Sequence, residues 1–176
     1  MRLQKLLNEV VYDQKNPKKL FNLAREYDIL GQGAAAVSFY IKAADLEEED
    51  KVLQYRALIY AGKIFDRQGN RRYTVQGLFQ HALSLIPTRP EAHYFLAQFY
   101  VESEDWRHCI IHAKYGLMFK DGHQDIDVGY PGELGLYYLR ALAQWRINNQ
   151  EDSREMFFDM KHRMKLTEEY DKMVDN

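Results

Sequence analysis

The strongest constraint on the fold of this chain is an internal repeat of small and aromatic residues. In the first copy they lie at the spacings of a helix, a tight turn and a second helix, at Ala24, Tyr27, Gly31, Ala36, Tyr40 and Ala43. The order returns at Gly62, Phe65, Gly69, Val75, Phe79 and Ala82, then at Ala97, Tyr100, Glu104, Cys109, Ala113 and Gly116. A looser fourth copy contains Ala141, Asn148, Ser153 and Phe157. A single helix pair cannot bury its own apolar stripe, so the pattern predicts helix pairs that stack on one another.

Apolar residues within the repeat recur at helical spacing, as at Leu20, Leu23, Ala24, Tyr27 and Leu30. This spacing predicts amphipathic helices with one continuous packing stripe. Two flanking segments share it. Residues 1–14 predict an additional N-terminal helix, and residues 150–174, with Met156, Phe157, Met160 and Met164, predict a helix that caps the other end.

The residues of this pattern resemble the tetratricopeptide repeat (TPR), and the resemblance covers residues 17–160. It implies an all-α, right-handed α-solenoid of three to four helix-turn-helix units, forming a single domain over 1–176. The expected parts are an N-terminal helix at 1–14, repeat units at 17–50, 55–88, 90–119 and 134–166, and an inter-repeat loop at 120–133. Glu104 and Asn148 depart from the family pattern, because they stand where the turn glycine is expected.

Charge and cysteine content exclude several classes of function. The 24 basic and 26 acidic residues leave a net charge of −2, which does not support whole-surface attraction to nucleic acid or to an anionic membrane. One cysteine permits no internal disulfide. Charged and amide residues interrupt every apolar run among the first twenty residues, so no signal peptide or membrane span is expected there. We expect a cytoplasmic protein without nucleic-acid or membrane partners, and the oligomeric state stays open.

Candidate metal ligands gather in two places, but neither has the spacing of a known site. The loop carries Asp121, His123, Asp125 and Asp127. Gly132 stands where a calcium loop would place its bidentate glutamate, so a polar connection is the favoured interpretation. On a predicted helix, His108 and His112 are four residues apart, beside Cys109, but two ligands do not make a zinc site. Without a serine elbow or a phosphate-binding loop either, we expect no cofactor, no metal and no independent enzyme.

The first helix of each predicted unit would line a concave groove, which is the better candidate site. Its predicted inward residues are Phe21, Arg25, Arg56, Tyr60, Lys63, Arg67, Tyr94, Gln98, Tyr138 and Trp145. Aromatic rings beside cations suit a protein or peptide partner with acidic groups. The alternative is that the aromatic residues pack between units while the cations pair with Asp28 and Asp66. The TPR clamp for the carboxylate tail of chaperones is not expected, because Phe21, Arg25 and Tyr60 stand where it needs Lys and Asn.

Residues 89–145 show a narrower resemblance. Their pattern resembles the TPR region that follows the catalytic domain of some bacterial and phage inverting glycosyltransferases. The matching residues are Arg89, Glu91, Leu96, Ala97, Tyr100, Asp105, Trp106 and Cys109. Because the remaining chain is too short for a nucleotide-sugar domain, the resemblance implies an accessory or orphaned interaction module without transferase activity, with a glycosyltransferase among its candidate partners. The alternative is that these residues only cap helices and pack locally.

Overall fold

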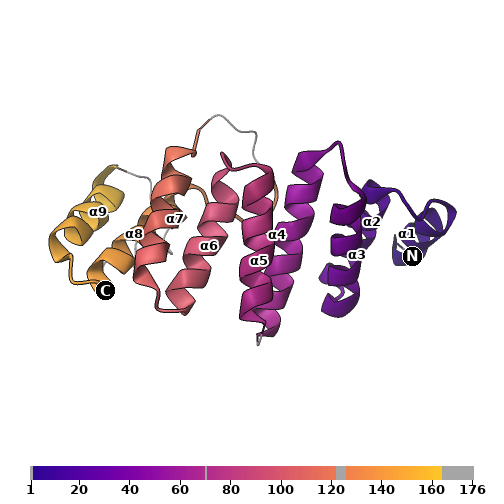
Figure 1. Ribbon diagram of the computed structural model, residues 1–176, viewed down its shortest axis with the longest axis horizontal. Coiled ribbons are helices and arrows are strands. Elements are labelled where there is room, and N and C mark those ends of the chain that lie inside the picture. The colour runs from indigo at the N-terminus through magenta and orange to yellow at the C-terminus, as the bar shows by residue number, and fades with distance from the viewer. Residues whose placement is uncertain (1, 70, 122–125, 164–176) are drawn as a thin grey trace. The chain divides into compact units, whose positions relative to one another are not determined.

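The fold is all-α. The computed structural model describes the chain except residues 1, 70, 122–125 and 164–176, and the described residues contain no strand. Its helices follow one another along the chain (Figure 1). Within the described residues they are α1 (Arg2–Tyr12), α2 (Pro17–Ile29), α3 (Gly33–Leu46), α4 (Lys51–Gln68), α5 (Arg72–Leu85), α6 (Pro90–Glu102), α7 (Trp106–Met118), α8 (Glu133–Arg146) and α9 (Gln150–Arg163). The second repeat therefore begins at Lys51, four residues before the predicted boundary.

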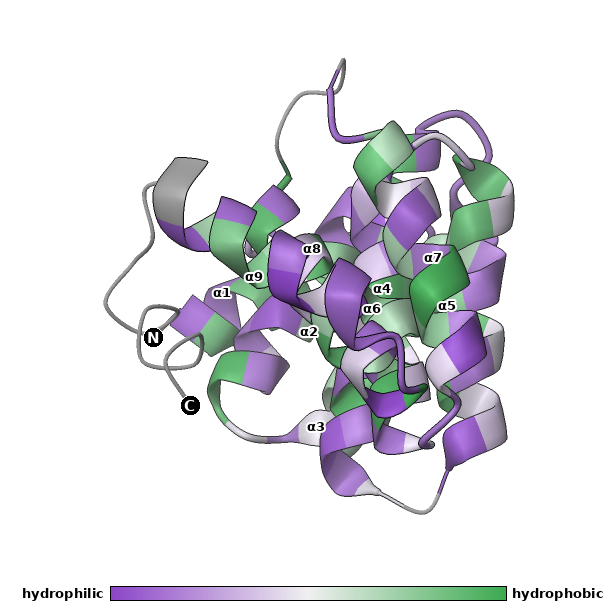
Figure 2. Ribbon diagram, turned by 90° about the vertical axis from the view of Figure 1, so that its left-hand side faces the viewer, coloured by the Kyte–Doolittle hydropathy of each residue, from purple (hydrophilic) through white to green (hydrophobic). Residues whose placement is uncertain are grey.

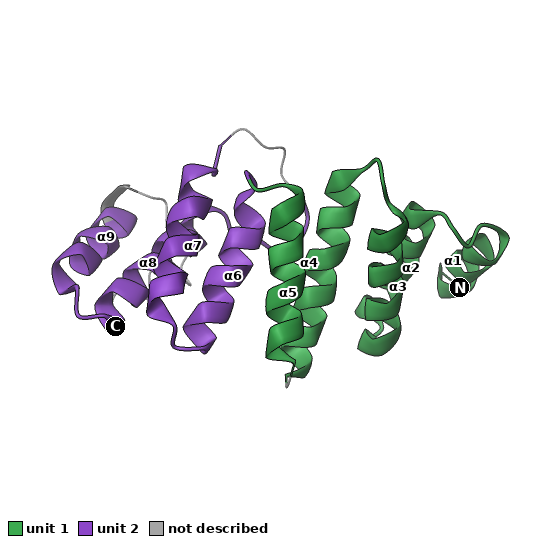
Figure 3. Ribbon diagram, viewed as in Figure 1, with its two compact units in different colours: residues 1–87 green, residues 88–176 purple. Residues whose placement is uncertain are grey.

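The helices divide into two compact units, residues 1–87 and residues 88–176 (Figure 3). In unit 1, α1 packs on α2, and the pairs α2/α3 and α4/α5 join through the packing of α4 on both α3 and α2. In unit 2, the pairs α6/α7 and α8/α9 join in the same way, through α8 on both α7 and α6. The described residues thus contain four helix pairs, the upper limit of the expected range. The predicted terminal cap, α9, is the second helix of the fourth pair, and Met164 lies outside the described residues. The single domain over 1–176 stays a prediction.

Three of the turns inside the pairs have the same backbone geometry. In the first, Gly31 has a positive φ of 72°, and the Gln32 N–H donates to the Tyr27 carbonyl at 2.8 Å. In the third and fourth turns, around Glu104 (φ 55°) and Asn148 (φ 69°), a backbone N–H likewise donates to the carbonyl five residues earlier. A left-handed residue with this hydrogen bond satisfies the orphan carbonyls at a helix end. The two residues that replace the expected glycine therefore keep its conformation.

Short polar side chains cap the starts of α2 and α4. The Asn16 side chain accepts a hydrogen bond from the Lys19 N–H at 3.2 Å, directly before Pro17 opens α2. Asp50 caps α4 in the same way through the Leu53 N–H at 2.9 Å. Such caps satisfy backbone donors that have no partner within the helix. They explain why α2 and α4 begin where they do.

The small residues of the repeat lie where two helices approach each other closely. Ala24, Ala97 and Ala141 are fully buried. At the matching position of α4, a Cβ built on Gly62 would lie only 2.5 Å from the buried Phe79 ring of α5. Close approach of the helices therefore requires the small side chains that the repeat predicts.

Hydrophobic and hydrophilic residues are mixed along the individual helices (Figure 2). This mixture fits helices that bury one stripe against their neighbours. Among the described residues, no helix combines the length and the apolar character that a membrane crossing requires.

Candidate functional site: one face of α2 and α4

Three aromatic rings form the base of a candidate binding face in unit 1. Phe21 of α2 meets Tyr40 of α3 edge to face, with ring centroids 5.3 Å apart, and meets Tyr60 of α4 at 5.9 Å. Tyr40 and Tyr60 stack nearly parallel at 5.3 Å. Phe21 and Tyr40 are buried, whereas Tyr60 is half-buried. We call these three residues the aromatic cluster. It joins the two helix pairs of unit 1, and only its Tyr60 ring is partly exposed.

Cationic side chains lie against the aromatic cluster. The Arg56 guanidinium carbon lies 4.9 Å from the centroid of the Phe21 ring. The Arg25 guanidinium carbon and the Lys63 ammonium nitrogen lie 5.7 Å and 5.8 Å from the centroid of Tyr60. These distances fall within the range of cation–π attraction, which holds flexible cations in place at a surface. Five of the predicted groove residues are thus brought together on one face of α2 and α4.

A pocket of about 280 Å³ opens beside this cluster. We call it the α2/α4 pocket; its lining residues are Lys18, Phe21, Asn22, Arg25, Asp50, Val52, Leu53 and Arg56. Sequence reasoning had identified Phe21, Arg25 and Arg56 but missed the other five. Helical spacing could have identified two of them on α2, because Lys18 and Asn22 share a helical face with residues 21 and 25.

The sixth groove residue predicted in this unit, Arg67, pairs with an aspartate, as the alternative interpretation expected. Its guanidinium lies 2.6 Å from the Asp28 carboxylate in an ion pair across α2 and α4. Asp66 has a different environment: burial raises the pKa of its carboxyl, and the charge of Arg72 acts in the opposite direction. Arg67 thus has a local partner, while Arg56 lies against a ring.

The groove residues predicted in unit 2 have different surroundings. Tyr94 of α6 contacts Tyr130 of the α7–α8 connection, with ring centroids 5.5 Å apart. Tyr138 of α8 meets Phe157 of α9 at 6.4 Å. Trp145 lies in the last turn of α8 with 44% of its surface exposed, and Gln98 is half-buried on α6. Their role in binding stays a prediction, and the cation–aromatic cluster of unit 1 makes α2 and α4 the stronger candidate.

The two histidines on α7 have separate partners. The His108 ring nitrogen Nδ1 lies 2.7 Å from the Asp105 carboxylate. His112 lies inside the α6/α7 pair, with its Nδ1 3.2 Å from Nδ1 of His93. Burial, together with the neighbouring His93 and His108, lowers the pKa of His112 to about 4. Among the residues that the structure describes, no three His, Cys, Asp or Glu side chains converge as metal ligands. Loop residues 122–125, which include His123 and Asp125, lie outside that description.

Several residues behind the narrower resemblance have local structural partners. Arg89 and Glu91 form a buried ion pair with N–O distances of 2.7 and 3.1 Å. Asp105 caps α7 by accepting a hydrogen bond from the His108 N–H. Cys109 is fully buried, and its thiol donates to the Leu139 carbonyl at 3.5 Å. These contacts give each residue a role within unit 2 that needs no partner enzyme.

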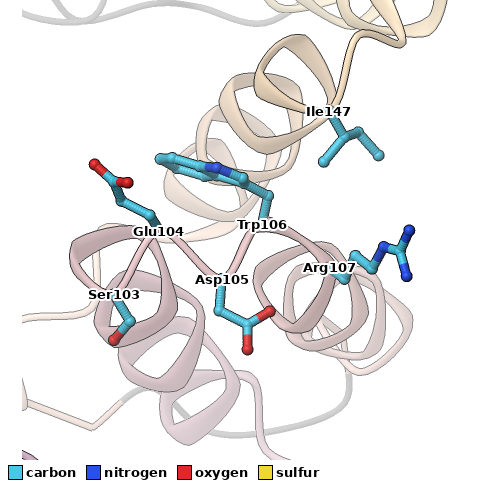
Figure 4. Close-up of a pocket in the computed structure, with 6 residues that line it drawn as sticks. All are labelled: Ser103, Glu104, Asp105, Trp106, Arg107 and Ile147. Atoms are coloured by element: carbon cyan, nitrogen blue, oxygen red, sulfur yellow. The ribbon is translucent and has the colours of Figure 1, made fainter.

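Trp106 borders a second, open pocket of about 360 Å³ in unit 2. The Trp106 indole and the Ile147 side chain line it, and the Asp105 carboxylate points away from the indole (Figure 4). The Arg146 guanidinium carbon lies 5.6 Å from the Trp106 ring. A cation of unit 2 itself therefore already contacts the aromatic wall of this pocket.

Comparison with known proteins assigns the fold. No family model matches the sequence, and no curated protein does. Among solved structures, MamA matches with a TM-score of 0.71 and 17% identity over 88% of this chain and 82% of its own. YrrB, a TPR protein with an unusual peptide-binding site, matches with a TM-score of 0.64 and 14% identity over 88% and 72%. PilF of Pseudomonas aeruginosa matches with a TM-score of 0.70 and 12% identity over 97% and 71%.

The fold is therefore that of TPR proteins. At these identities the likeness concerns the fold alone. The comparisons show no link to a glycosyltransferase, so that resemblance of residues 89–145 stays a prediction.

Proposed function

We propose that this protein is a non-catalytic interaction scaffold that binds an extended segment of a partner protein on the α2/α4 face. The observation that carries the proposal is the aromatic cluster, with Tyr60 half-exposed between the Arg25 and Lys63 cations. Rings and cations held in place lose little conformational entropy when a ligand binds. A pocket of defined volume beside them gives a side chain of the partner a place to insert.

A peptide selection tests this proposal. The full-length chain is used to select ligands from a random-peptide display library, and selected peptides are synthesised and titrated. Tyr60→Ala removes the half-buried ring, and Lys63→Glu reverses a neighbouring charge; each should weaken binding by about tenfold or more. Lys42→Glu makes the same charge reversal at an exposed site of α3, and it should leave the affinity unchanged. Selected peptides whose affinity ignores both Tyr60 and Lys63 would place the binding site elsewhere.

The alternative function is an accessory TPR module of a nucleotide-sugar glycosyltransferase system. It rests on the pattern of residues 89–145. The buried Arg89–Glu91 ion pair and the Asp105 cap explain much of that pattern without a second protein. A binding measurement between the full-length chain and a glycosyltransferase encoded beside it would test the alternative directly.

A further inference from the structure

The α2/α4 pocket has an unbalanced set of charges. Its lining includes three cations, Lys18, Arg25 and Arg56, and one carboxylate, Asp50. That carboxylate already accepts the hydrogen bond of the Leu53 N–H at the start of α4. The lining therefore has an excess of positive charge, which favours an anionic group of a ligand.

Arg56 is the residue whose surroundings point most clearly to a ligand. Its guanidinium lies against the Phe21 ring, which orients the planar group. Its Nε is buried and has no hydrogen-bond partner among the residues that the structure describes. A carboxylate is the acceptor that matches the planar guanidinium, because its two oxygens can accept two parallel hydrogen bonds.

The pocket also limits the size of the group that it can hold. At about 280 Å³ it lies below the usual range for whole small-molecule ligands, so it fits one or two side chains. Phe21, Val52 and Leu53 give it an apolar wall next to the cations. This combination suits a carboxylate that is followed or preceded by an apolar residue.

We propose that the α2/α4 pocket binds an aspartate or glutamate side chain within the partner segment, with an apolar neighbour against Val52 and Leu53. This inference rests on the proposed function, because it names the chemistry of the same binding face. Arg56 is the main contact with the carboxylate. Lys18 and Arg25 add to its attraction without determining its orientation.

A double-mutant cycle on a selected, C-terminally amidated peptide tests the inference. The acidic residue of the peptide is changed to its amide, and the protein carries Arg56→Gln. Each change alone should weaken binding by about tenfold or more, and the double change should cost scarcely more than either one. Arg56→Lys keeps the charge without the planar fork and should recover part of the affinity. Lys42→Gln is the matched control, and thermal unfolding by circular dichroism shows whether each variant is folded.

The outcomes separate this inference from the proposed function. Selected peptides that need Tyr60 and Lys63, yet lack an acidic residue or ignore Arg56→Gln, would overturn the inference and leave the proposed function standing. Loss of binding on amidation of the C-terminus would also overturn it, because the carboxylate would then be a chain end. Peptides that ignore Tyr60 and Lys63 would overturn the proposed function itself.

Discussion

Replacing glycine by alanine should have opposite effects on the free energy of unfolding at two positions of unit 1. Gly62 in α4 and Gly77 in α5 both lie inside helices, where replacement by alanine gains about 1 kcal/mol of helix propensity. A Cβ on Gly77 would meet no atom within 4 Å. A Cβ on Gly62 would lie 2.5 to 3.0 Å from three atoms of the Phe79 ring.

The size of the difference follows from packing. Phe79 is 2% exposed, so its ring cannot turn into solvent to make room. Overpacking of this kind costs about 3 kcal/mol, and the propensity gain offsets about 1 of these. Gly62→Ala should therefore lower the free energy of unfolding by about 2 kcal/mol, while Gly77→Ala should raise it by about 1 kcal/mol.

Urea denaturation followed by far-UV circular dichroism measures both changes. The two tryptophans, Trp106 and Trp145, lie in unit 2, so tryptophan fluorescence follows that unit separately while the dichroism covers both. For a unit of this size, a change of about 1 kcal/mol in the free energy of unfolding shifts the melting temperature by about 4–8 °C. Equal stabilisation by the two substitutions would refute the close packing of α4 on α5 at Gly62.

Three further predictions concern single side chains. Because the pKa of His112 is about 4 in the folded protein, against an ordinary value of 6.5, the neutral ring stabilises the fold above about pH 6.5. As pH falls from 6.5 towards 4, about 2 kcal/mol of that stability should be lost after allowing for partial exposure; a His112→Gln variant with an unchanged pH profile of unfolding would contradict this. Burial raises the pKa of the Cys109 thiol to about 12, so a thiol reagent should label it only in urea; equal labelling of the native protein would contradict its burial. The Tyr40 hydroxyl is buried without a hydrogen-bond partner in the described part of the chain, so Tyr40→Phe should raise the free energy of unfolding by about 1 kcal/mol, and a loss in urea titration would contradict this.

Much of the fold follows from residues close together in the sequence. The small residues at 24, 62, 97 and 141 predict where helices meet, and all four are buried. Asn16 before Pro17 predicts the start of α2, because cap and proline act within one turn. Glu104 and Asn148 looked like departures from the repeat. They nevertheless adopt the left-handed conformation. The hydrogen bond from the following N–H to the carbonyl five residues earlier can stabilise that conformation in a residue with a side chain.

The candidate site could be predicted only in part, because its parts lie far apart in the sequence. Periodicity places Phe21 and Arg56 on the first helix of their pairs, but it does not give the contact between them. Asp50 and Leu53 line the pocket because α4 begins at Lys51, four residues earlier than expected. Tyr40 belongs to the second helix of its pair, outside the predicted groove residues, although it stacks on Tyr60. Such contacts depend on how the two pairs pack.

The most direct test of the account is to map where a selected peptide binds on the folded, full-length chain. Backbone chemical shifts are recorded by NMR as the peptide is added. We expect the largest changes in α2 and α4, centred on Phe21, Arg56 and Tyr60, with little change along α7. Changes that gather instead around Trp106 and Ile147, with α2 and α4 unaffected, would contradict the central claim that the α2/α4 face is the binding site.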